Sequence, residues 1–324
     1  MTTTLHTYSF RAMNTDMETI LLLEEGDDRI GRLEAYTADW FAFAEEVFSR
    51  FRPDSELSRI NRSGGALGMV SDTMAEVLGL SEQLTRETQG VFSPLLLEAL
   101  EASGYRESFE RLPGRASISG PVPPVRPGME WNPGMKAVCL AAGSRLDLGG
   151  VVKGWAAEKL AGWLSGRWGI RAGIVNAGGD LSVWGAPAPG ESWLVGTADP
   201  WKGDEDAGML AVSGRGAVAT SSVLGRRWTT DRGERHHLID PRTMESSRSD
   251  IVQCTVAGPR LPLAEAWAKA LCILGSDEGL KLFRERAPSY SAFCFTEEGR
   301  LIYCGRPEKR DAWTGREIDR TIGE

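Results

Sequence analysis

The sequence predicts an α+β fold, with a mixed, largely antiparallel sheet and helices packed on it. Strand-like runs in the second half, such as residues 193–197 and 208–212, follow one another through short turns, which is typical of antiparallel pairing. Residues 29–51 repeat apolar side chains at helical spacing, which predicts an amphipathic helix. Residues 263–274 are apolar on nearly every side, and such a helix is buried against other elements.

The first half predicts one strand, several helices and a loop. We expect a strand at 17–23, a hairpin-like turn at 25–28, helices at 29–51, 55–61, 71–88 and 95–102, and a turn at 90–94. Pro53 ends the first helix. Residues 112–134 are rich in proline and glycine, which favours a loop excursion rather than a domain boundary.

The second half alternates strands with turns and contains two helices. We expect strands at 137–140, 193–197, 208–212, 251–258, 291–295 and 300–303, two more joined by a Gly-Gly turn within 174–185, and helices at 156–164 and 263–274. No internal repeat is present, so we expect residues 1–324 to form a single unit.

The composition excludes several classes of partner. The chain of 324 residues is 41% hydrophobic and carries a net charge of −8, which argues against nucleic acid or an anionic membrane as the main partner. No apolar run is long enough to cross a bilayer. The five cysteines lack metal-ligand spacing, and an odd number is a poor disulfide framework. Free thiols, and a start without a signal-peptide pattern, predict a cytoplasmic protein.

A glycine-rich turn at residues 147–155 is the first candidate site. It joins a strand to a helix and contains Asp147, Gly149, Gly150 and Lys153. Glycine lets backbone N–H groups approach a ligand, and a helix N-terminus favours a phosphate. The alternative is an ordinary turn with an aspartate cap and a surface lysine. Neither the P-loop nor the dinucleotide-binding spacing is present.

Two charged residues in the apolar helix are the second candidate. Glu265 and Lys269 are four residues apart and therefore share one helix face. Small apolar residues flank them, so we expect a pair that is buried or lines a cleft, and such pairs often mark sites. The alternative, a surface salt bridge, requires an exposed stripe.

A histidine pair is the third candidate. His237 follows His236 and precedes Asp240 by three residues, which suits a general base with an orienting carboxylate. Two strand histidines on opposite faces are the alternative. Asp180, after the Gly-Gly turn, is either catalytic or a turn residue. Arg226 and Arg227 either bind phosphate or are exposed.

Taken together, these motifs resemble the ApbE family, the FAD:protein FMN transferases, along nearly the whole chain. The matching segments are residues 10–15, 48–61, 90–94, 104–105, 147–154, 175–180, 219–221, 237–243 and 264–275. The resemblance implies an ApbE-like, T-fold-related α+β fold with FAD in a cleft. It also implies that Mg²⁺ helps to transfer the FMN half of FAD to a threonine or serine hydroxyl on an acceptor protein, with release of AMP.

The resemblance also assigns roles to individual residues. The family's N-terminal methionine falls on Met13, and its aromatic residue before Pro-Asp-Ser falls on Phe51. The aspartate and lysine of the central motif fall on Asp147 and Lys153. The histidine that acts as the base falls on His237. Further cofactor contacts are expected at Phe92, Ser93, Gly149, Gly150, Asp180 and Asp240, and metal contacts at Gly150 and Glu265.

The chain departs from the family pattern at several places. Asn14 replaces a glycine, and Ser93 replaces an aspartate. The late metal motif, usually Ala-Asp-Ala and then a threonine, has Glu265 and Lys269 instead. A protonated lysine cannot ligate Mg²⁺, so we hypothesise that Lys269 partly or wholly replaces the metal. The alternative functions are an FAD-binding protein without transfer activity and an FAD pyrophosphatase; an interaction protein without a nucleotide is a third, disfavoured by the clustered motifs.

Overall fold

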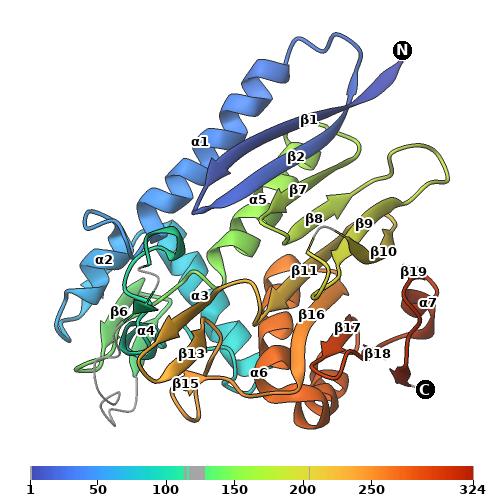
Figure 1. The fold of residues 1–324 in the computed structure, drawn as a ribbon. Helices are drawn as coiled ribbons and strands as arrows, with labels where there is room; N and C mark the ends of the chain where they lie inside the picture. The colour runs from blue at the N-terminus through green and yellow to red at the C-terminus, as the bar shows by residue number, and fades with distance from the viewer. Residues whose placement is uncertain (1, 113–114, 117–127, 204, 324) are drawn as a thin grey trace.

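A long, mostly antiparallel sheet is the main element of the fold (Figure 1). The computed structural model describes residues 2–112, 115–116, 128–203 and 205–323. Within them the sheet has nine strands, in the order β1 (Thr3–Ala12), β2 (Thr15–Glu24), β7 (Gly173–Ala177), β8 (Leu181–Trp184), β11 (Gly216–Ser222), β16 (Ile251–Gly258), β17 (Ser291–Thr296), β18 (Leu301–Cys304) and β20 (Arg320–Ile322). All neighbours pair antiparallel except β18 and β20. The structure therefore confirms the predicted α+β class.

Three long helices pack against this sheet and against one another. They are α1 (Ile30–Phe48), α5 (Val152–Gly166) and α6 (Leu261–Arg286). The first contacts β1 and α5, the second contacts β7 and β8, and the third contacts β11, β16 and α5. Burial of Leu33, Phe41 and Phe48 along one face of α1 follows the predicted amphipathic spacing. The packing of α5 against α6 brings the two charged helix motifs together.

Further helices and small sheets complete the described chain. The helices are α2 (Glu56–Asn61), α3 (Asp72–Glu87), α4 (Leu97–Ala102), α7 (Pro307–Arg310) and the 3-10 turn Phe109–Arg111. The small sheets consist of β3 (Gly68–Met69), β6 (Ala137–Leu140) and β5 (Met129–Asn132); β13 (Gly233–His236), β12 (Arg227–Thr230) and β4 (Arg115–Ala116); β14 (Ile239–Asp240) and β15 (Glu245–Ser246); and β9 (Trp193–Ala198), β10 (Asp206–Val212) and β19 (Trp313–Gly315).

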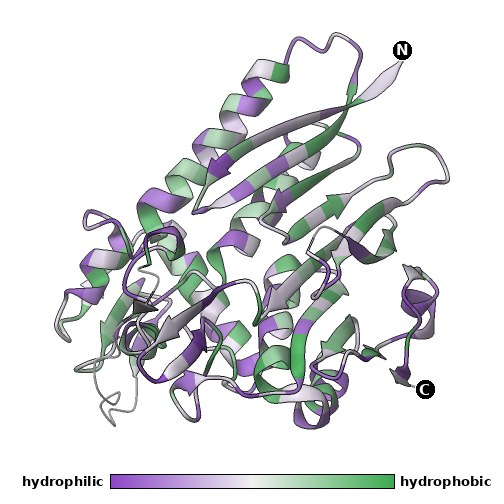
Figure 2. Cartoon of the chain, in the orientation of Figure 1, coloured by the Kyte–Doolittle hydropathy of each residue, from purple (hydrophilic) through white to green (hydrophobic). Residues whose placement is uncertain are grey.

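The sheet is covered on both faces near its C-terminal strands. Every residue of β17 and β18 is buried. In a sheet covered on one face only, every second residue would be exposed instead. Trp313 of β19 stacks on Phe293 at 4.8 Å between ring centroids, and Trp201 meets Phe295 edge-on. Hydrophobic residues also dominate β7 and β8, whereas α7 near the C-terminus is hydrophilic (Figure 2).

One local prediction needs correction. The predicted hairpin at residues 25–28 is wrong, because this segment leads from β2 into α1. The hairpin instead turns at Met13 and Asn14, whose φ angles of 51° and 57° give the mirror-image turn that suits strand twist. Asparagine tolerates this left-handed backbone, which explains how Asn14 stands where the family has glycine.

Segment 112–134 is only partly described. Its residues 113–114 and 117–127 lie outside the described residues, so the predicted loop excursion stays a prediction there. Next to them, Met129–Asn132 forms β5 and pairs antiparallel with β6. In the part of the chain that the structure describes, no helix is both long and apolar enough to cross a membrane.

Candidate active site

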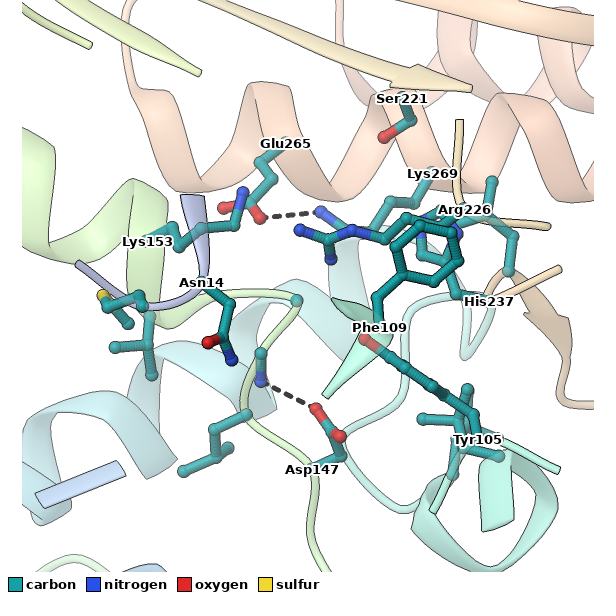
Figure 3. A pocket seen from close by; sticks show the side chains of 18 of the residues that line it. Asn14, Tyr105, Phe109, Asp147, Lys153, Ser221, Arg226, His237, Glu265 and Lys269 are labelled. Carbon is teal, nitrogen blue, oxygen red and sulfur yellow. Dashed lines mark hydrogen bonds and ion pairs between the residues drawn. The ribbon is translucent and has the colours of Figure 1, made fainter. Parts of the chain in front are cut away.

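One cleft of about 460 Å³ collects nearly all of the predicted site residues. Those that line it are Met13, Phe51, Phe92, Ser93, Asp147, Gly149, Gly150, Lys153, Asp180, His237, Glu265 and Lys269. They come from the β1–β2 turn, the loops after α1 and α3, the turn before α5 and its first residues, the β7–β8 turn, the loop after β13 and one face of α6. Asp240 is not among the described residues that line this cleft. The structure thus brings together segments that are far apart in the chain (Figure 3).

Asp147 is held by two partners at one side of the cleft. Its Oδ1 accepts a hydrogen bond from the N–H of Gly149 at 2.7 Å, and its Oδ2 lies 2.7 Å from Nε of Arg50. The Arg50 guanidinium is buried and lies over the ring of Phe51, 4.1 Å from its centroid. It also lies over Tyr105, at 4.9 Å. Arg50 therefore joins the predicted carboxylate to an aromatic group at the cleft.

Sequence reasoning did not single out Arg50 or Tyr105 as site residues. Both fall inside segments that match the family, but a lone arginine beside Phe51 carries no signal of its own. The signal that Tyr105 offered was its place in the matching segment 104–105, to which no role was assigned. In the structure Tyr105 stacks on Trp228 at 5.3 Å, and Phe109 also lines the cleft.

Lys153 is turned toward a carboxylate rather than standing free. Its Nζ lies 2.9 Å from Oδ2 of Asp180, and both side chains are largely buried. Burial disfavours the charge of Lys153, but the carboxylates of Asp180 and Glu265 outweigh it and hold the lysine pKa above its usual value. Asp180 follows the Gly178–Gly179 turn, where φ values of 71° and 94° require glycine. Asp180 is therefore a partner of Lys153 and not only a turn residue.

The Glu265–Lys269 pair enters the interior as predicted. Glu265 has 1% of its side chain exposed, Lys269 has 19%, and Nζ lies 2.7 Å from Oε1. The second oxygen, Oε2, accepts from the N–H of Gly154 in the first turn of α5, at 3.2 Å. A carboxylate is favourable at a helix N-terminus. Burial nevertheless raises the pKa of Glu265 above its usual value, against the opposing effect of the Lys269 charge.

The two histidines have different surroundings. His236 is buried, and its Nε2 lies 3.0 Å from the carbonyl oxygen of Ser247, so its role is structural. His237 lines the cleft, and its Nδ1 is buried without a hydrogen-bond partner among the described residues. Burial, with the charges of Arg226 and Lys269, holds the pKa of His237 well below its usual value. Its imidazole is therefore neutral at pH 7 and can accept a proton.

Asp240 does not orient His237. Its carboxylate accepts from Nε and the backbone N–H of Arg242, at 3.0 and 2.9 Å, and these contacts outweigh burial and lower its pKa. A spacing of three residues does not determine whether the two side chains meet. In the structure the chain bends between His237 and β14. The expectation that Asp240 orients the base is therefore wrong, and its contact with the cofactor stays a prediction.

The adjacent arginines Arg226 and Arg227 lie in different surroundings. Arg227 is exposed, and its Nη1 lies 3.5 Å from Oε2 of Glu234. Arg226 lines the cleft, and Figure 3 draws its side chain beside Lys269 and His237. The sequence offered the pair as possible phosphate ligands without separating them. Arg226 lies in the bend just before β12 and Arg227 begins that strand, and only the fold decides which of the two meets the cleft.

The residues around Glu265 do not fit a magnesium ion. Both carboxylate oxygens already have donors, Lys269 Nζ and Gly154 N–H, and the nearby Asp180 is paired with Lys153. Magnesium requires several oxygen ligands in near-octahedral geometry, and an ammonium on the ligand repels it. Among the described residues, no group of three or more His, Cys, Asp or Glu is placed to hold a metal.

Sequence comparisons agree with the geometry of the cleft. The model of the ApbE family matches residues 13–294. The FAD:protein FMN transferase of Treponema pallidum is 28% identical over 283 residues, which cover 78% of this chain and 74% of that protein. The protein of the same name from Escherichia coli K12 is 24% identical over 271 residues, 79% of this chain and 74% of that protein.

Solved structures show the same fold. The ApbE protein of Thermotoga maritima superposes with a TM-score of 0.79 at 20% identity, covering 92% of this chain and 96% of that one. The apo flavinyl transferase ApbE of Pseudomonas stutzeri gives 0.76 at 19% identity, with 93% of each chain covered. At such identities the likeness establishes the arrangement of helices and strands.

Proposed function

Because the chain belongs to the ApbE family, we propose that it transfers the FMN half of FAD to a hydroxyl group of an acceptor protein and releases AMP. The observation that carries this proposal is the convergence of His237, Lys153 and Lys269 in one cleft. A neutral base and cationic groups are the parts that transfer of a phosphoryl group requires.

The proposed step breaks the phosphoanhydride bond of FAD and forms a phosphoester bond to the acceptor. The acceptor oxygen bonds to the phosphorus of the FMN half, and the bond from that phosphorus to the bridging oxygen breaks. AMP leaves with the bridging oxygen. His237 takes the hydroxyl proton, for which its lowered pKa keeps it unprotonated. Cationic side chains stabilise the charge on the phosphate oxygens.

The pyrophosphate is expected along the start of α5 and the facing part of α6. Of the amides that the sequence offered there, Gly149 already donates to Asp147 and Gly154 donates to Glu265. Side-chain cations therefore supply phosphate contacts that these two amides do not make. Since the donors around Glu265 do not suit magnesium, no step of this mechanism uses a metal.

The flavin and adenine rings require apolar contact at the ends of the cleft. Phe51 is 37% exposed, and Tyr105 and Phe109 line the cleft beside it. Aromatic faces of this kind stack on planar ligand rings. We propose that the acceptor presents a threonine or serine, whose oxygen reaches His237 from the open side. The whole chain, residues 1–324, acts as one catalytic unit in this proposal.

We also propose that the enzyme works in the cytoplasm. Cys139, Cys254, Cys272, Cys294 and Cys304 are free thiols. Sγ of Cys254 lies 3.5 Å from Sγ of Cys294 on the neighbouring strand without a bond. Adjacent unoxidised thiols suit a reducing compartment.

Incubation of the purified protein with FAD and candidate acceptors tests the function. We expect flavin fluorescence to remain with an acceptor after denaturation, and its mass to rise by one FMN at a threonine or serine. His237→Asn should lower this rate by about a hundredfold or more, because general-base catalysis contributes that much.

Two other outcomes would contradict the proposal. Free FMN and AMP without modified acceptor would indicate a pyrophosphatase. Unchanged FAD bound to the protein would indicate a binding protein without transfer activity. The neutral His237 can deprotonate an attacking water as well as an acceptor hydroxyl, so the products of this experiment separate the two activities.

A further inference from the structure

Lys269 occupies the cleft side of a carboxylate that is otherwise enclosed. Glu265 is one helical turn before it on α6, and the ammonium lies 2.7 Å from Oε1. Gly150 faces the same lysine, since a Cβ at this glycine would lie 3.6 Å from Cε of Lys269. The ammonium is thus fixed between the start of α5 and the open cleft.

Arg226 places a second cation next to this ammonium. Figure 3 shows the two side chains converging in the cleft, with Glu265 joined to Lys269 by an ion pair. Within the described residues, Arg226 forms no ion pair with a carboxylate, whereas Arg227 pairs with Glu234. Only Lys269 has a carboxylate partner, and two converging cations repel each other unless a further anion lies near them.

The described ion pairs leave two charged groups of the cleft lining without an ionic partner: Arg226, and Glu45, whose Oε2 accepts a hydrogen bond from the N–H of Met13. The described pairs are Arg50 with Asp147, Lys153 with Asp180, Lys269 with Glu265, and Glu110 with Arg11. Arg226 is the lining cation that these pairs leave over. A guanidinium binds phosphate oxygens in a two-pronged, directional way, and an ammonium binds them as a point charge. The arrangement therefore suits a diphosphate rather than a neutral ligand.

We propose that Arg226 and Lys269 together bind the pyrophosphate of FAD in place of a divalent metal ion, so that this protein handles FAD without magnesium. The inference rests on the proposed function and adds two specific ligands to it. Glu265 then acts as a positioning residue that holds Lys269 at the start of α5. Both of its carboxylate oxygens already accept hydrogen bonds, from Lys269 and Gly154, so neither is available as a metal ligand.

Calorimetric titration with FAD tests the inference. Binding to the unaltered protein should be the same in excess EDTA and in excess Mg²⁺. Arg226→Met and Lys269→Met should each weaken FAD binding by roughly tenfold to a hundredfold, the effect of one lost charged hydrogen bond. Both should also flatten the salt dependence of the affinity, because a charge at the ligand has gone. Arg227→Met is the matched control and should change neither quantity.

Conservative variants separate charge from shape. Arg226→Lys and Lys269→Arg keep the charge and should retain most of the affinity, with circular dichroism used to check folding. FAD binding that requires added Mg²⁺, or an Arg226→Met variant indistinguishable from Arg227→Met, would overturn the inference. Flavin transfer that proceeds only with Mg²⁺ would leave the proposed function intact and remove this inference alone. Failure to bind FAD under either condition would remove both.

Discussion

At the scale of single residues, the cleft is organised by alternating charges. Asp180, Lys153, Glu265 and Lys269 follow one another, with Arg226 beside the last. Buried ion pairs of this kind are costly to break, because removal of one partner leaves the other uncompensated. Substitutions in this cluster of charges should therefore affect the stability of the protein as well as FAD binding.

The lowered pKa of His237 predicts the acid side of the pH profile. Since burial and the charge of Arg226 lower this pKa, the turnover number at saturating FAD should stay constant as the pH falls to 6.5 and decline only below it. Arg226→Ala removes one cause of the lowering, so the pKa rises and the decline should move to higher pH. Rate measurements across pH check this. Arg227→Ala should leave the profile where it is, and an equal shift would contradict the assignment.

Replacement of glycine by alanine should have opposite effects on stability at two positions of α5, Gly154 and Gly162. A Cβ at Gly154 would lie 2.5 Å from Oε2 of Glu265, so Gly154→Ala should displace this buried carboxylate and cost about 1–3 kcal/mol of unfolding free energy. Gly162, also in α5, has nothing within 4 Å of such a Cβ. Gly162→Ala should therefore stabilise by about 0.5–1 kcal/mol. Denaturant unfolding measures both, and a similar result for the two would refute the contact.

At the scale of elements, α6 consists of two helical parts. Gly275 interrupts it with φ 81° and ψ −176°, at the point where sequence periodicity ended. The second part starts at Ser276, whose N–H donates to Oδ1 of Asp250 at 2.8 Å and whose hydroxyl donates to Oδ2 at 2.5 Å. The first part presents the charged pair to the cleft, and the second carries the basic residues Arg284 and Arg286 in its last turn.

Asp250 is therefore a helix cap supplied by another segment. Asp250→Ala should destabilise the protein by about 1 kcal/mol, the usual cost of a lost cap. Asp250→Asn keeps an oxygen that accepts from Ser276 and should cost less. Thermal unfolding of the two variants gives the comparison. Equal losses would indicate that the charge of Asp250, rather than its capping oxygen, matters.

At the scale of the whole molecule, one enclosed region of the sheet lies apart from the cleft. The cleft lies between α5, α6 and the N-terminal hairpin turn, whereas β17 and β18 are enclosed by the small sheet of β9, β10 and β19. None of the residues of β17, β18 or β19 lines the described cleft. A change in the enclosed region should therefore alter unfolding without altering FAD binding.

Trp313 provides the test of this separation. It is 9% exposed and stacks on Phe293, so Trp313→Ala should cost about 3 kcal/mol. Trp201 covers the same sheet but is 45% exposed, and Trp201→Ala should cost clearly less. Urea unfolding and FAD titration are measured together. A loss of FAD affinity in folded Trp313→Ala would show that the two regions are coupled.

Sequence periodicity and residue type were sufficient for much of this protein. The burial of Glu265 with Lys269 followed from an apolar helix interrupted by two charges four residues apart, which the structure confirms. The helices at residues 29–51, 71–88 and 263–274 were predicted because amphipathic or apolar spacing acts within a few turns of the chain. The identity of the cleft residues followed from motifs whose order matched one family.

Only the tertiary structure decided which charge meets which. Lys153 pairs with Asp180, 27 residues away, and Gly154 donates to Glu265 across 111 residues, and no local rule links such positions. Among neighbouring residues too, only the fold decides that Arg226 lines the cleft while Arg227 pairs with Glu234, and that Asp240 binds Arg242 rather than orienting His237. Electrostatic partners depend on distances set by how α5, α6 and the sheet pack, and packing sums weak contacts from the whole chain.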